Sequence, residues 1–252
     1  MLYAYSHKTR KRMEVPTGKT SGGRYVVVFD CESDSLFSTL PGESHEDKIR
    51  YMQFTVVSAL ALPCELIEAG APIDDIMSRG VVYNWWRDVA EDGNNPLVSL
   101  LALFDGAEAI VGYNCNGFDF PLIRRFYRPT QSTAHPVQRY VDHRTKTLDI
   151  MSRVKDATGS YMKLDELLKR NGLSSKSSNG KEAVGMWERG ERDALKSYCD
   201  TDVMLTAKLA LLETLAISNV VRIGGAGCGL RAFLASQSAT KQAQVDDSFV
   251  LV

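Results

Sequence analysis

Short apolar runs, separated by polar and turn-rich segments, dominate this chain and predict a central β-sheet. The run Tyr-Val-Val-Val-Phe at residues 25–29 is β-branched and aromatic, which is typical of a strand buried on both faces. We place the first strand at residues 24–30. Similar runs predict strands at residues 48–62, 81–86, 109–113 and 147–151. The first two are expected to pair as a hairpin and the first three to form a meander.

Apolar residues at helical spacing follow and interrupt these strands. They predict helices at residues 95–106, after a turn at Gly117, at 163–170 and, longest of all, at 192–215. Residues 129–146 and the Ser-, Lys- and Gly-rich residues 173–181 are expected to be loops. Residues 63–79 and the segment beyond Asn219 have no clear pattern. Because strands come first and then alternate with helices, the sequence predicts an α/β fold.

Composition and charge narrow the class of protein. The 252 residues are 44% hydrophobic and 24% charged, which suits one large domain or two small ones with a packed core. A formal net charge of −1 means that any nucleic-acid contact must use a local basic surface. We expect a basic, flexible arm at residues 1–23, a main domain at 24–218 and an extension of unknown role at 219–252. This arm has two alternative interpretations. It either contacts phosphates or directs the protein to the nucleus, or it is a plain solvated tail.

The cysteine pattern and the lack of long apolar runs bear on the compartment. The five cysteines are scattered and include no Cys-x-x-Cys pair, so neither a zinc knuckle nor a disulfide framework is indicated. This favours an intracellular, reducing compartment without separating cytoplasm from nucleus. No run reaches membrane-spanning length and no signal peptide is recognisable, so no membrane partner is expected. His135 and His143 lack a partner at metal-ligand spacing and are expected on the surface.

Two acids stand at the end of the first strand. Asp30 and Glu32 are two residues apart, and on a strand such residues point to the same side. Two carboxylates held this close repel each other, and burial increases the repulsion. Divalent cations, which take oxygen ligands, relieve it. The alternative is a strand end with solvated acids in a loop, so the metal-site interpretation depends on further carboxylates.

Two more segments each place an acid at the edge of an apolar element. Asp119 follows the strand at 109–113, while Tyr198 and Asp202 are four residues apart and share one helix face. The alternatives are a helix N-cap for Asp119, a solvated helix acid for Asp202 and a core position for Tyr198. Together the acids suit phosphodiester hydrolysis by two metal ions about 3.5–4 Å apart. Tyrosine, with a pKa of about 10, is a poor base but can orient water.

Three motifs in this order resemble those of the DEDDy 3′–5′ exonucleases: Phe-Asp-x-Glu-x-Asp-Ser-Leu at 29–36, Gly-Tyr-Asn-x-x-x-Phe-Asp-x-Pro at 112–121 and Tyr-x-x-x-Asp at 198–202. The first is similar to the proofreading domain of family A DNA polymerases and the second to that of family B. The layout resembles stand-alone exonucleases related to the family B domain, over about residues 24–216. Ser197 occupies the place of the histidine in the histidine subclass, which favours the tyrosine subclass.

The resemblance implies a ribonuclease H-like fold with a mixed five-stranded sheet flanked by helices. It also implies 3′–5′ exonuclease activity that depends on two divalent metal ions, Mg²⁺ or Mn²⁺. Tyr198 is implied to hold the attacking water. The implied metal-site acids are Asp30, Glu32, Asp119 and Asp202. The implied substrate-binding positions, near the last nucleotides, are Leu36, Asn114 and Phe118.

The expected substrate is the 3′ end of single-stranded DNA, with release of nucleoside 5′-monophosphates. Exoribonuclease activity remains an alternative, because discrimination between RNA and DNA depends on how the protein contacts the terminal 2′-hydroxyl. A non-catalytic nucleic-acid-binding module on the same fold is the alternative from another class. The sequence specifies no replication or repair protein as a partner. The basic residues expected to follow the phosphate backbone, or else to form an ordinary solvated surface, are Arg124, Arg125, Arg128, Lys176 and Lys181.

Overall fold

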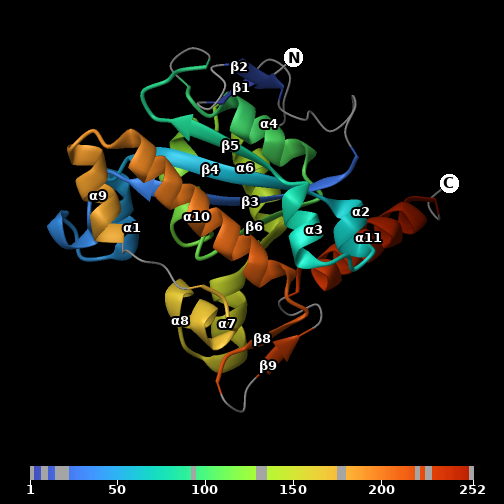
Figure 1. Cartoon of the computed structure of the whole chain (residues 1–252). Helices are drawn as coiled ribbons and strands as arrows, with labels where there is room; N and C mark the ends of the chain where they lie inside the picture. Colours follow the sequence, from blue (N-terminus) through green and yellow to red (C-terminus); the bar gives the residue numbers. More distant parts are fainter. Residues whose placement is uncertain are drawn as a thin grey trace.

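A five-stranded sheet lies at the centre of the computed structural model, in the order β5-β4-β3-β6-β7 (Figure 1). The structure describes residues 3–6, 11–14, 23–91, 95–128, 135–174, 180–218, 222–224 and 229–249. The strands of the sheet are β3 (Tyr25–Ser33), β4 (Phe54–Pro63), β5 (Val81–Trp86), β6 (Ala109–Gly112) and β7 (Thr147–Asp149).

The pairing of these strands is mixed. β3 pairs antiparallel with β4, and β4 pairs antiparallel with β5, as expected for a meander. On its other side β3 pairs parallel with β6, and β6 pairs parallel with β7. The predicted mixed five-stranded sheet is therefore confirmed.

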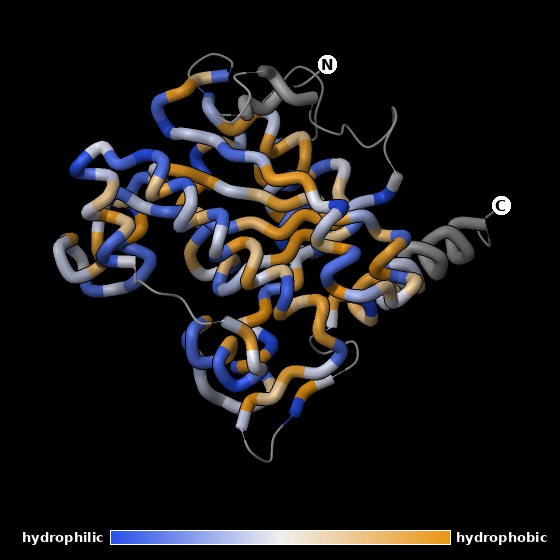
Figure 2. The backbone as a smooth tube through the Cα atoms, in the orientation of Figure 1, coloured by the Kyte–Doolittle hydropathy of each residue, from blue (hydrophilic) through white to orange (hydrophobic). Residues whose placement is uncertain are grey.

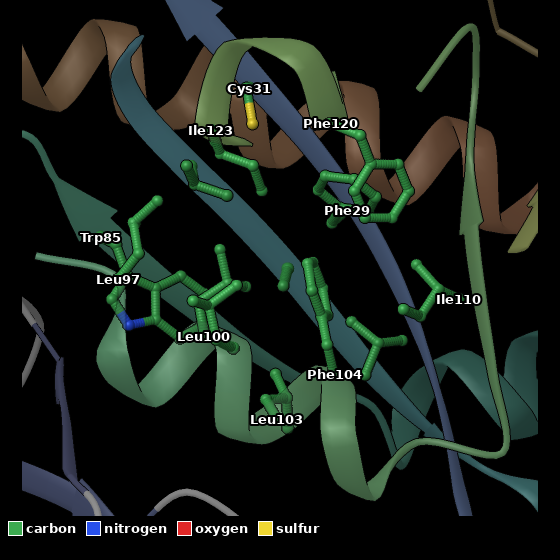
Figure 3. Packing of buried hydrophobic residues seen from close by; sticks show 14 of the residues in the cluster. Phe29, Cys31, Trp85, Leu97, Leu100, Leu103, Phe104, Ile110, Phe120 and Ile123 are labelled. Atoms are coloured by element: carbon green, nitrogen blue, oxygen red, sulfur yellow. The ribbon is translucent and has the colours of Figure 1, made fainter. Parts of the chain in front are cut away.

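The central strand β3 distributes its side chains to two helical layers. Val27, Phe29 and Cys31 point into one apolar core, while Val26 and Val28 belong to a second core on the opposite face. Figure 3 shows the first core, in which Phe29 lies beside residues of α4 and α5. The helices of this first layer are α1 (His45–Tyr51), α4 (Val98–Gly106), α5 (Asp119–Ile123) and α6 (Pro136–Thr145).

The opposite face of the sheet is covered mainly by the long helix α10 (Arg192–Leu211), which contacts β3, β4 and β6 (Figure 1). Val203, Ala207 and Leu209 of this helix are fully buried in the second core. Hydrophobic positions concentrate in the strands and become sparse toward the outer helices (Figure 2). The other helices that contribute to this core are α2 (Cys64–Glu68), α3 (Ile73–Ser78), α7 (Ile150–Thr158), α8 (Leu164–Arg170) and α11 (Leu230–Phe249).

Several predicted boundaries are wrong for local reasons. The strand predicted at 48–62 begins at Phe54, because residues 45–51 form α1, capped by Ser44, which accepts the Asp47 amide at 3.1 Å. The strand predicted at 147–151 ends at Asp149, which caps α7. The helix predicted at 192–215 ends at Leu211, and β8 (Thr214–Ala216) follows it.

The helix expected after Gly117 is short: α5 gives way to the 3-10 turn η2 (Arg124–Phe126). Another 3-10 turn, η1 (Phe37–Thr39), follows β3. Part of the loop expected at 173–181 is helical, since α9 (Gly180–Glu188) begins there, and residues 175–179 lie outside the described part.

The segment predicted as a loop at 129–146 contains helix α6, with Pro136 in its first turn. His143 of this helix was expected on the surface, but it is only 2% exposed. Its ring lies between Tyr127 and Asp105, and its other neighbours include Phe104. Hydrogen bonds on both ring nitrogens satisfy the polar groups, which is why a histidine can be buried here. His135 is exposed, as predicted.

The two ends of the chain add small elements to the main body. β1 (Tyr3–Ser6) and β2 (Lys11–Glu14) pair antiparallel within the segment expected to be an arm, whose mobility stays a prediction. β8 pairs with β9 (Arg222–Gly224) before α11 begins. Among the described residues, no helix has both the length and the apolar character needed to cross a membrane.

Candidate active site

The first part of the candidate site is the end of β3. Side chains alternate along this strand, so Asp30 and Glu32 follow Val26 and Val28 onto the face covered by α10. Glu32 is 9% exposed and Asp30 is half-buried. A ligand atom of each acid and the Sγ of Cys199 all lie within 4.8 Å of one another. The interpretation of these residues as solvated loop acids is therefore wrong.

Helix α10 provides the second part of the site. Tyr198 and Asp202 are 9% and 3% exposed, so neither is a solvated helix residue. Burial raises the pKa of Tyr198, and the nearby negative charges of Glu32, Asp202 and Asp30 raise it further. Tyr198 thus packs in the core, beside Leu195 and Cys199, and at the same time faces the acids of both motifs. Its phenol stays protonated at neutral pH.

Asp119 joins the site from the first turn of α5. It is the first residue of that helix rather than its N-cap, which is Phe118. Its Oδ1 accepts a 2.8 Å hydrogen bond from the backbone amide of Cys31, the residue between the two acids of β3. Asp119 is 3% exposed, and burial together with the charge of Asp30 raises the pKa of its carboxyl well above the usual range. The second motif is therefore in electrostatic contact with the first.

Three chain segments thus bring five predicted site residues together: Asp30 and Glu32 from β3, Asp119 from α5, and Tyr198 and Asp202 from α10. The shared burial is the physically important feature. Carboxylates removed from water and placed near one another destabilise their ionised forms unless an opposite charge is present. The arrangement is suited to binding positive charge.

The carboxylate oxygens of these acids are suitable ligands for hard divalent cations. Carboxylate oxygens are the ligands that Mg²⁺ and Mn²⁺ prefer. Cys199 also lines this cluster, and sequence reasoning missed it, since a single cysteine between Tyr198 and Asp202 gives no spacing signal. Burial raises the pKa of the Cys199 thiol well above the usual value, and the charges of Asp30 and Glu32 add to this. As a protonated thiol, Cys199 supports Asp30 rather than offering a thiolate ligand.

The predicted substrate positions lie around a neighbouring loop. Leu36 precedes η1, and Phe37 of that turn packs against Phe118 with ring centroids 5.8 Å apart. Asn114 has a left-handed backbone with φ of 62°, and its carbonyl accepts the amides of Gly117 and Phe118. The loop after β3 and the loop after β6 thus form one surface beside the acids.

Asp149 anchors the second loop and was not predicted as a site residue. Its carboxylate accepts the amides of Asn114 and Asn116, each at 2.9 Å, and that of Ser152 at 3.3 Å. It is 3% exposed. The available sequence signal was an acid between a strand and a helix, which is an N-cap pattern and gave no indication of the contact with a distant loop.

A cavity of about 650 Å³ opens next to this surface. It runs between the loop that follows β3 and helix α9, which the structure places beside β3. Leu36 lines one side and Val184 and Gly185 the other. Its charged lining residues carry both signs: Asp34, Lys181, Glu182, Glu188 and Arg189.

A mixed five-stranded sheet with acids from three motifs gathered beside β3 is the arrangement that the resemblance to the DEDDy 3′–5′ exonucleases implied. Residues 97–219 match the family described as "Predicted 3'-5' exonuclease related to the exonuclease domain of PolB". This match agrees with the enzyme class expected from the motifs. A comparison with curated proteins found no match.

Three solved structures that match this chain share at most 20% of its sequence, and the chain spans at most 40% of their length. The family B DNA polymerase from the archaeon Pyrobaculum calidifontis is 20% identical, with a TM-score of 0.45 over 74% of this chain and 24% of the polymerase chain. The zinc-bound E. coli ExoI–ssDNA complex is 14% identical, with a TM-score of 0.39 over 75% of this chain and 40% of the other. Another structure of exonuclease I is 15% identical, with a TM-score of 0.41 and the same two coverages.

Proposed function

We propose that this protein is a divalent-metal-dependent 3′–5′ exonuclease that hydrolyses the terminal phosphodiester of single-stranded DNA and releases nucleoside 5′-monophosphates. One observation carries this proposal: acids from β3, α5 and α10 meet in one buried cluster together with Tyr198. A scaffold protein has no physical reason to keep such mutually repelling carboxylates together. The match of residues 97–219 to a predicted 3′–5′ exonuclease family supports the same activity.

The carboxylates of Asp30, Glu32, Asp119 and Asp202 are the groups that would hold two ions, Mg²⁺ or Mn²⁺. When bound, such ions activate a water molecule as nucleophile and neutralise charge on the leaving 3′-oxygen. Asp30 would contribute to the site together with each of the other motifs, because it lies beside Glu32 and Cys199 and its charge raises the pKa of Asp119. Asp119 also fixes the strand end through the Cys31 amide.

Tyr198 is proposed to orient the attacking water. Because its pKa is raised by burial and by the surrounding acids, it keeps its proton at neutral pH and cannot act as a general base. A protonated phenol can still donate one hydrogen bond and accept another. The charges of Glu32, Asp202 and Asp30 all act on its hydroxyl, which supports this role.

The substrate end is proposed to lie in the cavity next to Leu36 and to reach the acids across the surface formed by Phe37 and Phe118. A single strand suits this surface, because unpaired bases can pack on apolar and aromatic side chains. Arg124, Arg125 and Arg128 are all exposed, although Arg124 lies over the ring of Tyr140 and Arg125 donates to the carbonyl of Met52 at 3.3 Å. Exposed arginines of this kind make binding salt-dependent.

The test is turnover of a 5′-labelled single-stranded DNA oligonucleotide and of an RNA with the same sequence. We expect a ladder that shortens from the 3′ end in Mg²⁺ or Mn²⁺, with mononucleotide products, and no cleavage in EDTA. Asp30→Ala and Asp202→Ala are expected to lose at least about 100-fold in rate while keeping most of their oligonucleotide binding.

The outcomes separate the alternatives. Faster cleavage of the RNA would identify an exoribonuclease. Binding of either oligonucleotide without cleavage in any metal would identify a non-catalytic module. Cleavage by Asp30→Ala at the wild-type rate would contradict the assignment of the site.

A further inference from the structure

A row of polar residues crosses the sheet beside the acid cluster. Asp30 of β3 pairs in register with Ser58 of β4, and Ser58 pairs in register with Asn84 of β5. Directly paired residues project to the same face, with Cβ atoms about 4.5–5.5 Å apart. This is the face covered by α10, so the row begins at a proposed metal-site acid and runs under the helix that carries Tyr198 and Asp202.

Helix α10 meets this row at Asp200. The Oδ1 of Asp200 accepts hydrogen bonds from the Ser58 hydroxyl at 2.8 Å and from the Asn84 amide at 2.6 Å. The Asn84 amide also donates to the Ser58 hydroxyl at 2.8 Å, which closes a triangle. Oδ2 of Asp200 accepts from Lys196, one helical turn earlier. Both carboxylate oxygens are thus engaged within the chain.

The neighbouring residue Cys199 continues the contact toward the acid cluster. Its Sγ lies 3.5 Å from the backbone oxygen of Asp30 and 3.8 Å from Oδ2 of the same residue. Two successive residues of α10 are therefore fixed on three adjacent strands: Cys199 on β3, and Asp200 on β4 and β5. Contacts of this kind resist rotation of the helix about its axis, which apolar packing alone resists weakly because it lacks direction.

We propose that Asp200, with Ser58 and Asn84, forms a clamp that sets the rotation of α10 and so positions Tyr198 and Asp202 against Asp30. This inference rests on the proposed exonuclease function. Side-chain atoms lie roughly 6 Å from a helix axis, so a rotation of about 10° displaces them by about 1 Å. A displacement of that size in a catalytic group can cost on the order of 100-fold in rate. Asp200 is in this sense a positioning residue, not a catalytic one.

The decisive comparison is Asp200→Ala against Asp200→Asn. The asparagine variant keeps an Oδ1 acceptor for Ser58 and Asn84 and loses only the ion pair with Lys196. We expect Asp200→Ala to lower kcat about tenfold with KM changed by less than about twofold, and Asp200→Asn to keep more than about half of kcat. Ser58→Ala should also lower kcat. The double variant with Asp200→Ala should have a kcat close to that of Asp200→Ala alone, since both substitutions remove the same hydrogen bond.

A matched control exists on α8, where Asp165 pairs with Lys169 at 2.6 Å with the same four-residue spacing. Asp165→Ala removes a comparable ion pair away from the row, and it should leave kcat and KM unchanged. Circular dichroism and the thermal midpoint show whether each variant is folded, and rates are expressed per folded protein.

Binding of Mn²⁺, followed by the electron paramagnetic resonance signal of the free ion, gives a readout independent of turnover. We expect the Kd for Mn²⁺ to rise severalfold in Asp200→Ala and to stay near wild type in Asp200→Asn and Asp165→Ala. Unchanged kcat and Mn²⁺ affinity in Asp200→Ala would overturn the clamp, as would equal losses in the alanine and asparagine variants. An inactive wild-type protein that binds Mn²⁺ would contradict the proposed function, and the affinities would still decide the clamp.

Discussion

The backbone amide of Cys31 donates a 2.8 Å hydrogen bond to Oδ1 of Asp119, although the two residues are 88 positions apart. This bond joins the end of β3 to the first turn of α5. It fixes the carboxylate of the second motif between the two acids of the first. The same bond explains how a buried Asp119 is tolerated, because a charged acceptor that receives a backbone amide recovers part of the hydration it has lost.

Asp119→Asn separates the structural role of this residue from its charge. The amide keeps an oxygen to accept the Cys31 bond and removes a buried charge beside Asp30, so in EDTA we expect unfolding free energy to rise by on the order of 1 kcal/mol. Exonuclease activity should fall by at least about 100-fold, because a metal-site oxygen donor has lost its charge. Thermal unfolding in EDTA and the cleavage rate measure the two effects. Destabilisation with activity retained would contradict the proposed role.

Tyr198→Phe tests the orientation of water. The phenylalanine preserves the packing against Leu195 and Cys199 and removes only the hydroxyl. We expect kcat to fall by about 10- to 100-fold without loss of all activity, since the acids that would hold the metal ions remain. Single-turnover rates are the appropriate measurement. A variant as fast as wild type would show that the hydroxyl has no part in the reaction.

The sequence predicted most of the sheet because apolar runs reveal buried strands directly, and β3 and β5 fall close to their expected positions. It failed at elements whose signal is a cap or a tertiary contact. Helix α1 was taken as part of a strand, because Ile49 and Tyr51 continue the apolar run while the Ser44 cap is a weak signal. Helix α6 was missed because its buried face consists of Arg139, Tyr140 and His143, which look polar in sequence.

The same distinction applies to the candidate site. Asp30, Glu32, Asp119 and Asp202 were found because acids next to apolar segments are unusual and their order matched a known set of motifs. Cys199, Asp149 and Asp200 were not found, since each acts through partners more than 30 residues away. Contacts of this kind leave no periodic trace in a single sequence.

Asp149→Ala tests the anchor of the loop that carries Asn114 and Phe118. Loss of the carboxylate leaves the amides of Asn114 and Asn116 without their acceptor, and hydrogen bonds to a charged group contribute about 1.5–3 kcal/mol each. We expect the unfolding free energy to fall by about 3 kcal/mol or more, and KM for single-stranded DNA to rise several-fold. Chemical denaturation and steady-state kinetics check this. A normal KM in the folded variant would show that the loop does not contact the substrate.

The buried His143 predicts a pH dependence of stability. Burial lowers the pKa of His143, although the carboxylate of Asp105 opposes this shift, and Lys146 and Arg139 add to it. The neutral ring fits its partners, with Nε2–H donating to Asp105 at 2.9 Å and Nδ1 accepting from the Tyr127 hydroxyl at 2.8 Å.

Because the folded-state pKa lies below the unfolded value of about 6.5, the unfolded state binds the extra proton as pH falls. The stability contributed by neutral His143 is therefore complete above about pH 6.5 and declines below it, by at most about 1.4 kcal/mol per pH unit. The pKa of Asp105 is also lowered, but its effect belongs to a more acidic window, below the usual carboxyl value.

As the pH is lowered from about 7 to 5, the urea midpoint of the wild type should accordingly fall. The midpoint of His143→Gln should depend less on pH, because its side chain does not titrate. The variant should be less stable at pH 7, because glutamine cannot reproduce both ring contacts. The raised pKa of Asp119 acts in the opposite direction in both proteins, so the informative quantity is the difference between them. The same pH dependence of the midpoint in the wild type and in His143→Gln would mean that His143 has the same pKa in both states. The burial of His143 between Tyr127 and Asp105 would then make no pH-dependent contribution to stability.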